Sequence, residues 1–260
     1  MNRLLRWQHR LPTLTALAPV FLLWEVVGRL EISAAVPRLG EIWDVVGIVV
    51  SQPGFREALV GSLRSFGIGF GLALLIGIGV GAAMAMFKPV EEALNLYVNM
   101  FMGAPMAAFV PLLVAIFGVG SGAIVATVFI FSVFIVLVNT YAGVRSASEV
   151  LLEMARSFGA PPTKRFLKIV LPSAMPLLLT GVRLGFSRSV SGLILGEMLI
   201  VVVGFGGLIM QTGSSFRVDQ LWVLIFIALS FALLGSRFLE YVQRRVVGWA
   251  STQGRKGAYE

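Results

Sequence analysis

Three ionisable side chains lie inside a long apolar segment in the second half of the chain. They are Arg183, Arg188 and Glu197, within residues 173–203. A charged group in hydrocarbon costs several kcal/mol unless it is paired or hydrated, so such residues mark a solute pathway or a structural contact between helices. An arginine that faces a central cavity could attract an anionic solute. Alternatively, neighbouring carbonyl groups or Glu25 could hold the arginine for stability.

Glu197 is followed by Met198 and then by a glycine-rich segment at residues 204–208. Nine residues separate it from Arg188, which is about two and a half helical turns, so the two side chains point to different faces. Each therefore needs another partner. Two interpretations of Glu197 stay open: a gate or pathway carboxylate, and a hydrogen-bond partner between helices.

A polar, basic, proline-containing loop interrupts the apolar pattern at residues 144–172. Ser148 can cap a helix of about ten residues, which Gly159 and the two prolines after it would end. A second, basic helix is expected over 163–170. The 3.6-residue repeat gathers apolar side chains on one side of the first helix and leaves charges on its other faces, so that side can bury in the groove of a partner. These apolar side chains are Leu151, Leu152, Ala155 and Phe158.

The spacing of residues in this loop resembles the cytoplasmic EAA loop of permease subunits of binding-protein-dependent ABC importers. Met154 stands where that loop usually has its middle alanine, and the other fixed positions match. The wider sequence, with residues 139–145, 180–184 and 196–198, looks like the nitrate, taurine and alkanesulfonate branch, and the resemblance covers roughly residues 36–245. The matching positions are Glu153, Ala155, Gly159, Ile169, Leu171 and Pro172.

The resemblance implies a type I permease architecture in which the short helix of the loop couples the membrane helices to a separate ATPase. It assigns that role to the matching positions above, together with Arg156. An amphipathic helix resting on lipid is the alternative, favoured by Lys164, Arg165 and Lys168. Attraction to lipid explains the basic residues, but it does not explain Glu153 or the fixed spacing.

The same resemblance implies partners: two cytoplasmic ATPase subunits, an extracytoplasmic solute-binding protein and a second copy of this chain. ATP and Mg²⁺ are expected on the ATPase, because this chain has no G-x-x-x-x-G-K-[ST] sequence. No cofactor or metal is expected on the chain itself, which has no cysteine and a single histidine, His9. The chain is therefore predicted not to be an enzyme.

Composition indicates a membrane protein without the resemblance, since 57% of residues are hydrophobic, 13% are charged and the mean hydropathy is +0.90. About six spans are long enough to cross about 30 Å of hydrocarbon. Pro105 and Pro111 should kink or break the third of them. The predicted spans are residues 12–30, 65–87, 92–118, 121–143, 173–203 and 219–242.

Basic residues predict the orientation. With the N-terminus in the cytoplasm, 13 of the 21 basic residues lie inside and 5 outside, as the positive-inside rule requires. The chain is then one all-α membrane domain over 12–245, between cytoplasmic tails at 1–11 and 246–260, in the plasma membrane of a prokaryote, or the inner membrane if the cell is Gram-negative. The outer segment near 42–50 is too short to span and should form an amphipathic surface helix.

Glycines on the second span form two pairs at helical spacing, Gly67 with Gly71 and Gly77 with Gly81. Such pairs let two backbones approach closely in lipid, either for sliding during transport or for static packing. Gly118, Gly120 and Gly122 predict a tight connection between the third and fourth spans.

Two other classes of protein fit the sequence less well. A secondary transporter or channel should show several paired acids inside the membrane or an inverted repeat, and neither is visible. A membrane-embedded enzyme should show clustered His, Asp or Cys on its spans, which are absent from this sequence.

Overall fold

The computed structural model describes residues 11–200 and 204–248, and every regular element in these ranges is a helix. The all-α prediction is confirmed. Contacts divide the described residues into two compact units. The larger unit comprises 57–200, 204–207 and 229–248, and the smaller unit comprises 11–56 and 208–228.

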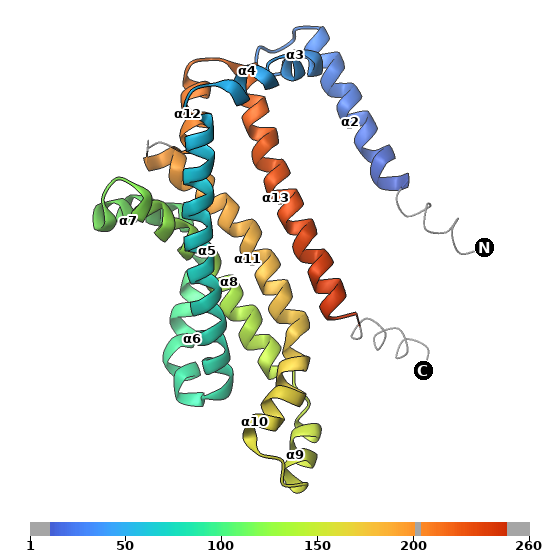
Figure 1. Cartoon of the computed structure of the whole chain (residues 1–260), viewed down its shortest axis with the longest axis vertical. Helices are drawn as coiled ribbons and strands as arrows, with labels where there is room; N and C mark the ends of the chain where they lie inside the picture. The colour runs from blue at the N-terminus through green and yellow to red at the C-terminus, as the bar shows by residue number, and fades with distance from the viewer. Residues whose placement is uncertain (1–10, 201–203, 249–260) are drawn as a thin grey trace, which may run out of the picture. The chain divides into compact units, whose positions relative to one another are not determined.

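The larger unit is a helical bundle with a protruding hairpin (Figure 1). Three helices, α5, α12 and α13, begin in one unit and end in the other. Its elements are α5 (Phe55–Met86), α6 (Lys88–Gly103), η1 (Met106–Phe109), α7 (Val110–Phe117), α8 (Ser121–Arg145), α9 (Glu149–Ser157), α10 (Pro162–Arg165), η2 (Phe166–Val170), α11 (Leu171–Ile200), the start of α12 (Phe205–Ser214) and the end of α13 (Val218–Val246).

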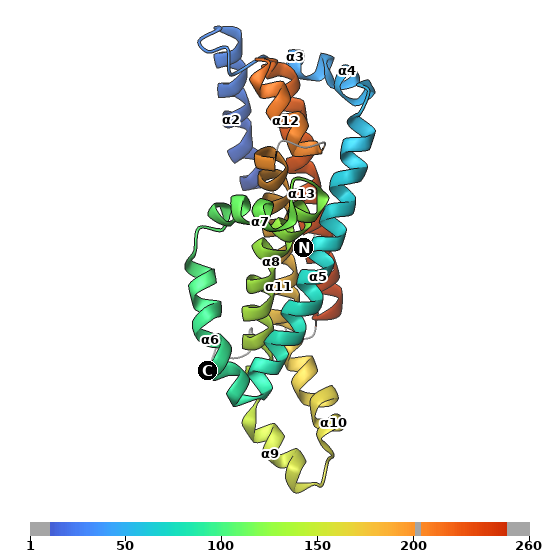
Figure 2. The same ribbon diagram turned by 90° about the vertical axis from the view of Figure 1, so that its left-hand side faces the viewer.

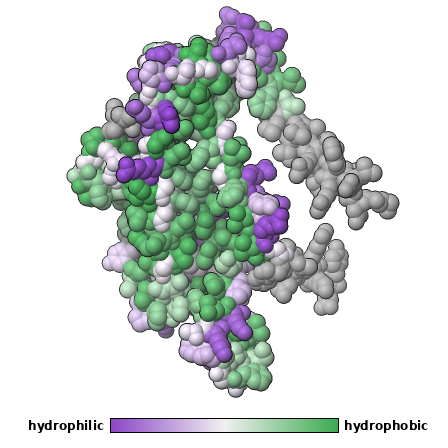
Figure 3. All heavy atoms as spheres, in the orientation of Figure 1, coloured by the Kyte–Doolittle hydropathy of each residue, from purple (hydrophilic) through white to green (hydrophobic). Residues whose placement is uncertain are grey.

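Four helical segments of the described chain are long and apolar enough to cross a membrane, and a bent pair makes a fifth. They match five of the six predicted spans, while the first predicted span coincides with α2 (Leu11–Arg29), which that count does not include. In Figure 3, apolar side chains cover much of the face over α5 and α11. The four segments are Phe55–Met86, Ser121–Arg145, Pro162–Ile200 and Val218–Val246.

Two predicted boundaries differ from the structure. Helix α5 begins ten residues before the predicted span, because its first turns carry charged residues that a search for apolar runs leaves out. The end of the fifth predicted span, residues 201–203, lies outside the described residues, as do most of the two predicted tails.

The third predicted span is broken, as the prolines predicted. Helix α6 ends at Gly103, and the following η1–α7 segment is bent from it by 101° (Figure 2). Pro105 lies in the break, where it caps η1. Pro111 lies instead in the first turn of α7, where a missing N–H costs nothing. Only the first of the two prolines therefore breaks the span.

A π-helical turn, η2, joins α10 to α11. It ends just before Pro172, whose ring would clash with the carbonyl group four residues earlier in a regular α-helix. Wider i→i+5 hydrogen bonding relieves this clash. The predicted second helix of the loop thus continues without interruption into a span of 39 residues.

Helix α8 is approached closely on two sides. On α11, a Cβ atom added to Gly192 would lie 2.8 Å from Cγ of Phe131, and one added to Gly185 would lie 2.7 Å from a methyl group of Val136. On α5, a Cβ atom added to Gly81 would lie 2.5 Å from the carbonyl oxygen of Leu137. Glycines on α11 therefore make room for side chains of α8, while those on α5 let the two backbones touch.

The glycine prediction is right for one pair and wrong for the other. Gly77 and Gly81 face α8, whereas Gly67 and Gly71 have no atom within 4 Å of an added Cβ. The buried ridge runs through Gly69, Gly77 and Gly81, with the fully buried Ala73 between them. The repeat indicated a close contact but not the face that makes it. At the start of α8, Gly118 and Gly120 have positive φ, which confirms the predicted tight connection.

The smaller unit contains α2, α3 (Leu39–Asp44) and α4 (Val46–Ser51), with the parts of α12 and α13 over 208–228. Two indole groups hold the segment that connects α2 to α3: Trp24 donates to the carbonyl oxygen of Pro37, and Trp222 donates to that of Ala35. The single amphipathic helix predicted at 42–50 is instead two short helices that meet at Val45. One hydrophobic repeat did not reveal this break.

Glu25 also belongs to the smaller unit. Its carboxylate accepts hydrogen bonds from Arg29 at 2.8 Å and from the backbone N–H of Leu39 at 3.2 Å. The structure therefore gives Glu25 partners within its own unit, at the end of α2.

We expect Gly81→Ala to destabilise the protein by about 1–3 kcal/mol, because the new methyl group would overlap a backbone atom of α8. Gly79→Ala is the matched control, since it adds the same group two residues away, where nothing lies within 4 Å. Both variants gain the same helix propensity. Thermal unfolding in detergent measures the difference, and equal stability of the two variants would contradict the close contact.

Candidate functional site

Helix α9 ends in a tight hydrogen-bonded turn that reverses the chain. Gly159 has φ +70°, the N–H of Ala160 donates to the carbonyl oxygen of Ala155 at 2.9 Å, and the N–H of Gly159 donates to that of Arg156 at 2.8 Å. This is the Schellman arrangement, in which the left-handed residue is usually glycine. Two of the matching loop residues, Ala155 and Gly159, therefore build the reversal between α9 and α10. Ser148 occupies the predicted N-cap position of α9, but its side chain makes no capping hydrogen bond.

The surface of α9 is unusually apolar for an exposed nine-residue helix. The side chains of Val150, Leu151, Met154 and Phe158 are exposed, Phe158 at 84% of its surface. Glu153 and Arg156 are exposed beside them. The predicted apolar side is thus divided, since Leu152 and Ala155 are partly covered while Leu151 and Phe158 face outward. Figure 1 shows this hairpin projecting beyond the ends of α8 and α11.

The remaining loop positions lie at the root of the hairpin. Ile169 is in the π-helical turn, and Leu171 and Pro172 begin α11; all three are half-buried. They are separated from Glu153 by the length of the hairpin. The structure therefore divides the predicted coupling residues into an exposed tip and a packed base.

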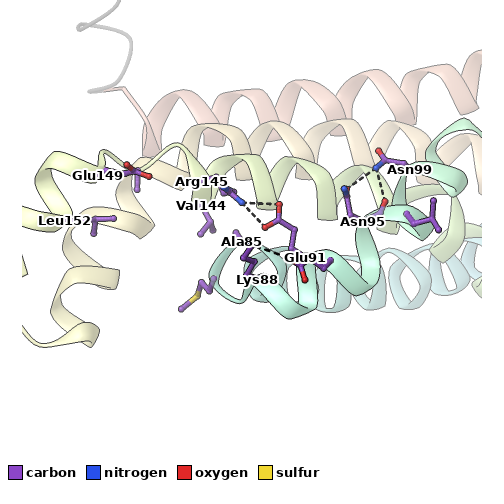
Figure 4. Close-up of a pocket in the computed structure, with 13 residues that line it drawn as sticks. Ala85, Lys88, Glu91, Asn95, Asn99, Val144, Arg145, Glu149 and Leu152 are labelled. Atoms are coloured by element: carbon purple, nitrogen blue, oxygen red, sulfur yellow. Dashed lines mark hydrogen bonds and ion pairs between the residues drawn. The ribbon is translucent and has the colours of Figure 1, made fainter.

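A cavity of about 900 Å³ lies beside this base, between α6, the end of α8 and the start of α9 (Figure 4). Glu91 of α6 accepts hydrogen bonds there from Arg145 and Tyr141, both on α8. Asn95 and Asn99 continue the polar lining along α6. Glu91 was not among the predicted site residues, because a single acid between two predicted spans carries no signal until its partner is known.

Arg188 lines a second cavity, of about 310 Å³, beside the break between α6 and η1. Its neighbours there are apolar side chains of α8 and residues 104–107 of the break. Arg183, five residues earlier and therefore on another face of α11, is half-buried and lines neither this cavity nor the one beside the hairpin. No carboxylate pairs with either arginine among the described residues. The two predicted pathway arginines therefore have different surroundings.

Glu197 is buried, with 1% of its surface exposed. Ser62 of α5 donates its hydroxyl hydrogen to Oε1 at 2.5 Å, and the backbone N–H of Gly206 donates to Oε2 at 2.7 Å. The N–H of Phe205 donates in turn to Oγ of Ser62 at 2.8 Å. Glu197 and Ser62 thus satisfy the first N–H groups of α12, which no residue of that helix can do.

Gly204 is explained by this network. A Cβ atom at this position would lie 2.6 Å from the carboxyl carbon of Glu197. Of the two interpretations of Glu197, the structure contains the hydrogen bond between helices. Glu197 and Arg64 also line a third cavity, of about 430 Å³, and a role for Glu197 in a pathway stays a prediction. Met198 follows on α11 and is half-buried.

Comparison with known families gives one match that covers most of the chain. Residues 73–248 match the family described as the inner membrane component of binding-protein-dependent transport systems. The chain belongs to this family. Its architecture of apolar helices is accordingly that of a multi-pass permease of an ABC importer.

Curated relatives of this permease support the branch that the sequence suggested. The taurine transport system permease protein of Escherichia coli K12 is 26% identical over 260 residues, covering 95% of this chain and 94% of that protein. An aliphatic sulfonates transport permease protein of Bacillus subtilis 168 is 25% identical, covering 90% and 86%. The similarity to the nitrate, taurine and alkanesulfonate branch is confirmed.

Solved structures share the fold of this permease. A chain of the MetNI methionine ABC transporter in an inward-facing conformation has a TM-score of 0.64 at 17% identity, covering 74% of this chain and 96% of that one. A chain of an amino acid ABC transporter gives a TM-score of 0.63 at 20% identity, with 76% and 97% covered. At these identities the likeness concerns the fold alone.

Replacing Glu197 with alanine should destabilise the permease by about 1–3 kcal/mol for each buried donor left without a partner. Ser62→Ala should also destabilise it, since this change removes the donor to Oε1 and the hydroxyl oxygen that accepts from the N–H of Phe205. Ser187→Ala is the control, because that exposed hydroxyl bonds only to the Arg183 carbonyl oxygen of its own helix. Thermal unfolding in detergent compares the three variants. Similar stability of the Glu197 and Ser187 variants would contradict the capping role.

Proposed function

We propose that this permease forms the pathway for a small anion and that separate ATPase subunits drive its transport by docking on α9. The observation that carries the proposal is the hairpin itself, where a short helix presents exposed apolar side chains beyond the bundle. Apolar groups exposed in water favour burial against a partner. Exposed charges at Glu153 and Arg156 would fix the register of that contact.

Docking on a protein explains this surface better than lying on lipid. A lipid surface attracts basic groups, which gather here on α10 and η2 as Lys164, Arg165 and Lys168. The exposed apolar residues belong to α9, where Glu149 and Glu153 would be repelled by anionic headgroups. The ATP and Mg²⁺ of the transport cycle would bind to the partner ATPase.

The assembly we propose contains two copies of this chain, two ATPase subunits and an extracytoplasmic binding protein that delivers the solute. Two copies are proposed because one chain offers half of a two-fold pathway. Both termini would lie in the cytoplasm, since this orientation puts most basic residues inside. ATP binding would close the ATPase subunits and open the pathway outward, and hydrolysis would return it inward.

The solute is proposed to be a sulfonate, with taurine and alkanesulfonates as first candidates and nitrate as another. The relatives named above carry taurine and aliphatic sulfonates in their names. Arg188 supports an anion, because this residue lines a cavity with apolar neighbours and has no carboxylate partner in the described chain. A guanidinium group can donate two parallel hydrogen bonds to such an anion.

We expect Glu153→Arg and Gly159→Val each to leave the permease in the membrane but to uncouple or lose the ATPase. The first reverses an exposed charge on α9, and the second forces a β-branched residue into positive φ and distorts the reversal. Co-purification and ATP-dependent uptake into vesicles measure the effect. Gly54→Val is the control, since Gly54 also has positive φ but lies far from the loop in sequence. Normal uptake in both loop variants would contradict docking on α9.

Arg188→Gln should reduce the uptake of taurine or an alkanesulfonate at least tenfold, because it removes the positive charge from a cavity with apolar neighbours. A tenfold loss corresponds to about 1.4 kcal/mol of lost interaction with the anion. Arg188→Lys keeps the charge and should retain more uptake, while ATP hydrolysis by the associated ATPase continues in both. Uptake of radiolabelled solute into vesicles separates the variants. Equal uptake in the two variants would exclude an electrostatic role for Arg188.

A further inference from the structure

Three side chains join the end of α8 to the start of α6, and we refer to Glu91, Tyr141 and Arg145 as the clasp. Nη1 of Arg145 donates to the two carboxylate oxygens of Glu91 at 2.8 and 3.1 Å. The hydroxyl group of Tyr141 donates to the same carboxylate. The guanidinium carbon of Arg145 lies 5.6 Å from the centre of the Tyr141 ring. Three hydrogen bonds therefore fix one carboxylate between two helices, and Figure 4 shows the two from Arg145.

The clasp lies at the root of α9. Arg145 is the last residue of α8, and only residues 146–148 separate it from α9. The hydroxyl group of Ser146 donates to the carbonyl oxygen of Gly143, which holds this short link against the last turn of α8. A displacement of α9 would therefore also displace Arg145, because the link between them is short and hydrogen-bonded.

Helix α6 has room to move at this end. One face packs on α8 through Val98, which contacts a cluster that includes Leu137. Another face, with Asn95 and Asn99, borders the 900 Å³ cavity rather than a neighbouring helix. At its far end α6 stops at Gly103, beside the 310 Å³ cavity of the break. A helix with open space along one face and a break at its end can tilt as a unit.

The clasp is too exposed to be explained by stability alone. The side chain of Arg145 is about half exposed, and ion pairs of that kind contribute little to stability. The three interactions instead fix the position of α6 relative to α8, since a carboxylate held by an arginine and a tyrosine has a defined position. The clasp therefore suits a mechanical link better than a stabilising contact.

We propose that the clasp transmits the displacement of α9 to α6, so that α6 tilts about the break when the ATPase subunits close. The three residues of the clasp act as positioning residues. Tilting changes the width of the polar space lined by Asn95 and Asn99. This inference rests on the proposed docking of the ATPase on α9, and it adds the element that responds inside the permease.

Absence of cysteine from the natural sequence makes the test direct, because a single introduced cysteine is unique in the chain. A spin label at Leu96→Cys, a position on α6 that is 65% exposed, reports on the cavity. The full permease with its ATPase subunits is compared without nucleotide and after trapping with ATP and vanadate. We expect the accessibility of the label to a water-soluble paramagnetic reagent to change between the two states.

Charge reversals then separate the clasp from a general effect on the fold. Glu91→Arg should abolish the change at Leu96→Cys while vanadate trapping persists, and Glu91→Arg with Arg145→Glu should restore it. Tyr141→Phe removes one hydroxyl group and should diminish the change. Glu92→Arg is the matched control: Glu92 is the next residue, 68% exposed, and pairs with Lys88 alone among the described residues, at 3.8 Å, so the change should persist.

A full change at Leu96→Cys in Glu91→Arg, or no recovery in the double reversal, would overturn the proposal. If Glu91→Arg also loses vanadate trapping, Tyr141→Phe decides the question, and an undiminished change in that variant overturns the proposal as well. Failure of the unmodified permease to associate with an ATPase or to trap vanadate would count against docking on α9 instead.

Discussion

The contact of α8 with glycines on two neighbouring helices is the constraint on which the rest of the larger unit depends. Hydrocarbon offers no hydrophobic effect to draw helices together, so they associate through close packing and the few polar bonds between them. Hydroxyl groups of Thr127, Ser132 and Thr140 on α8 donate to carbonyl oxygens of their own helix. These three buried hydroxyl groups therefore need no hydrogen-bond partner on a neighbouring helix. Backbones can then touch over several turns. This packing holds the two ends of the α9–α10 hairpin in place, since the hairpin leaves α8 and returns to α11.

Much of this architecture could be predicted from the sequence, because the lipid environment imposes strong rules on composition. Long apolar runs predicted the spans, and Pro105 predicted the break in the third. Ser148, Gly159 and the prolines after it predicted the two helices of the hairpin. Each of these signals is local: it depends on the chemistry of one residue or on a repeat along one helix.

Features that depend on a partner distant in sequence were missed. Gly67 and Gly71 have the same spacing as the packed glycines, but only the position of α8 decides which face is buried. The bond from Ser62 to Glu197 joins residues 135 positions apart, and a serine in an apolar span gives no sign of it. The same holds for Glu91 and Arg145, 54 positions apart. For Glu197, the sequence showed that a partner was needed but not which group supplies it.

The π-helical turn between α10 and α11 has a consequence for how this chain can vary. Each turn of i→i+5 bonding takes up one residue more than an α-turn, so η2 adjusts the rotational phase between the hairpin and the membrane part of α11. One residue corresponds to about 100° of rotation in an α-helix. Gaining or losing a residue between Gly159 and Pro172 would turn the hairpin relative to α11, because the glycine contacts with α8 fix the rotation of α11 itself. The number of residues in this loop thus determines the rotation of the hairpin relative to α11, as well as the distance between its exposed tip and its base.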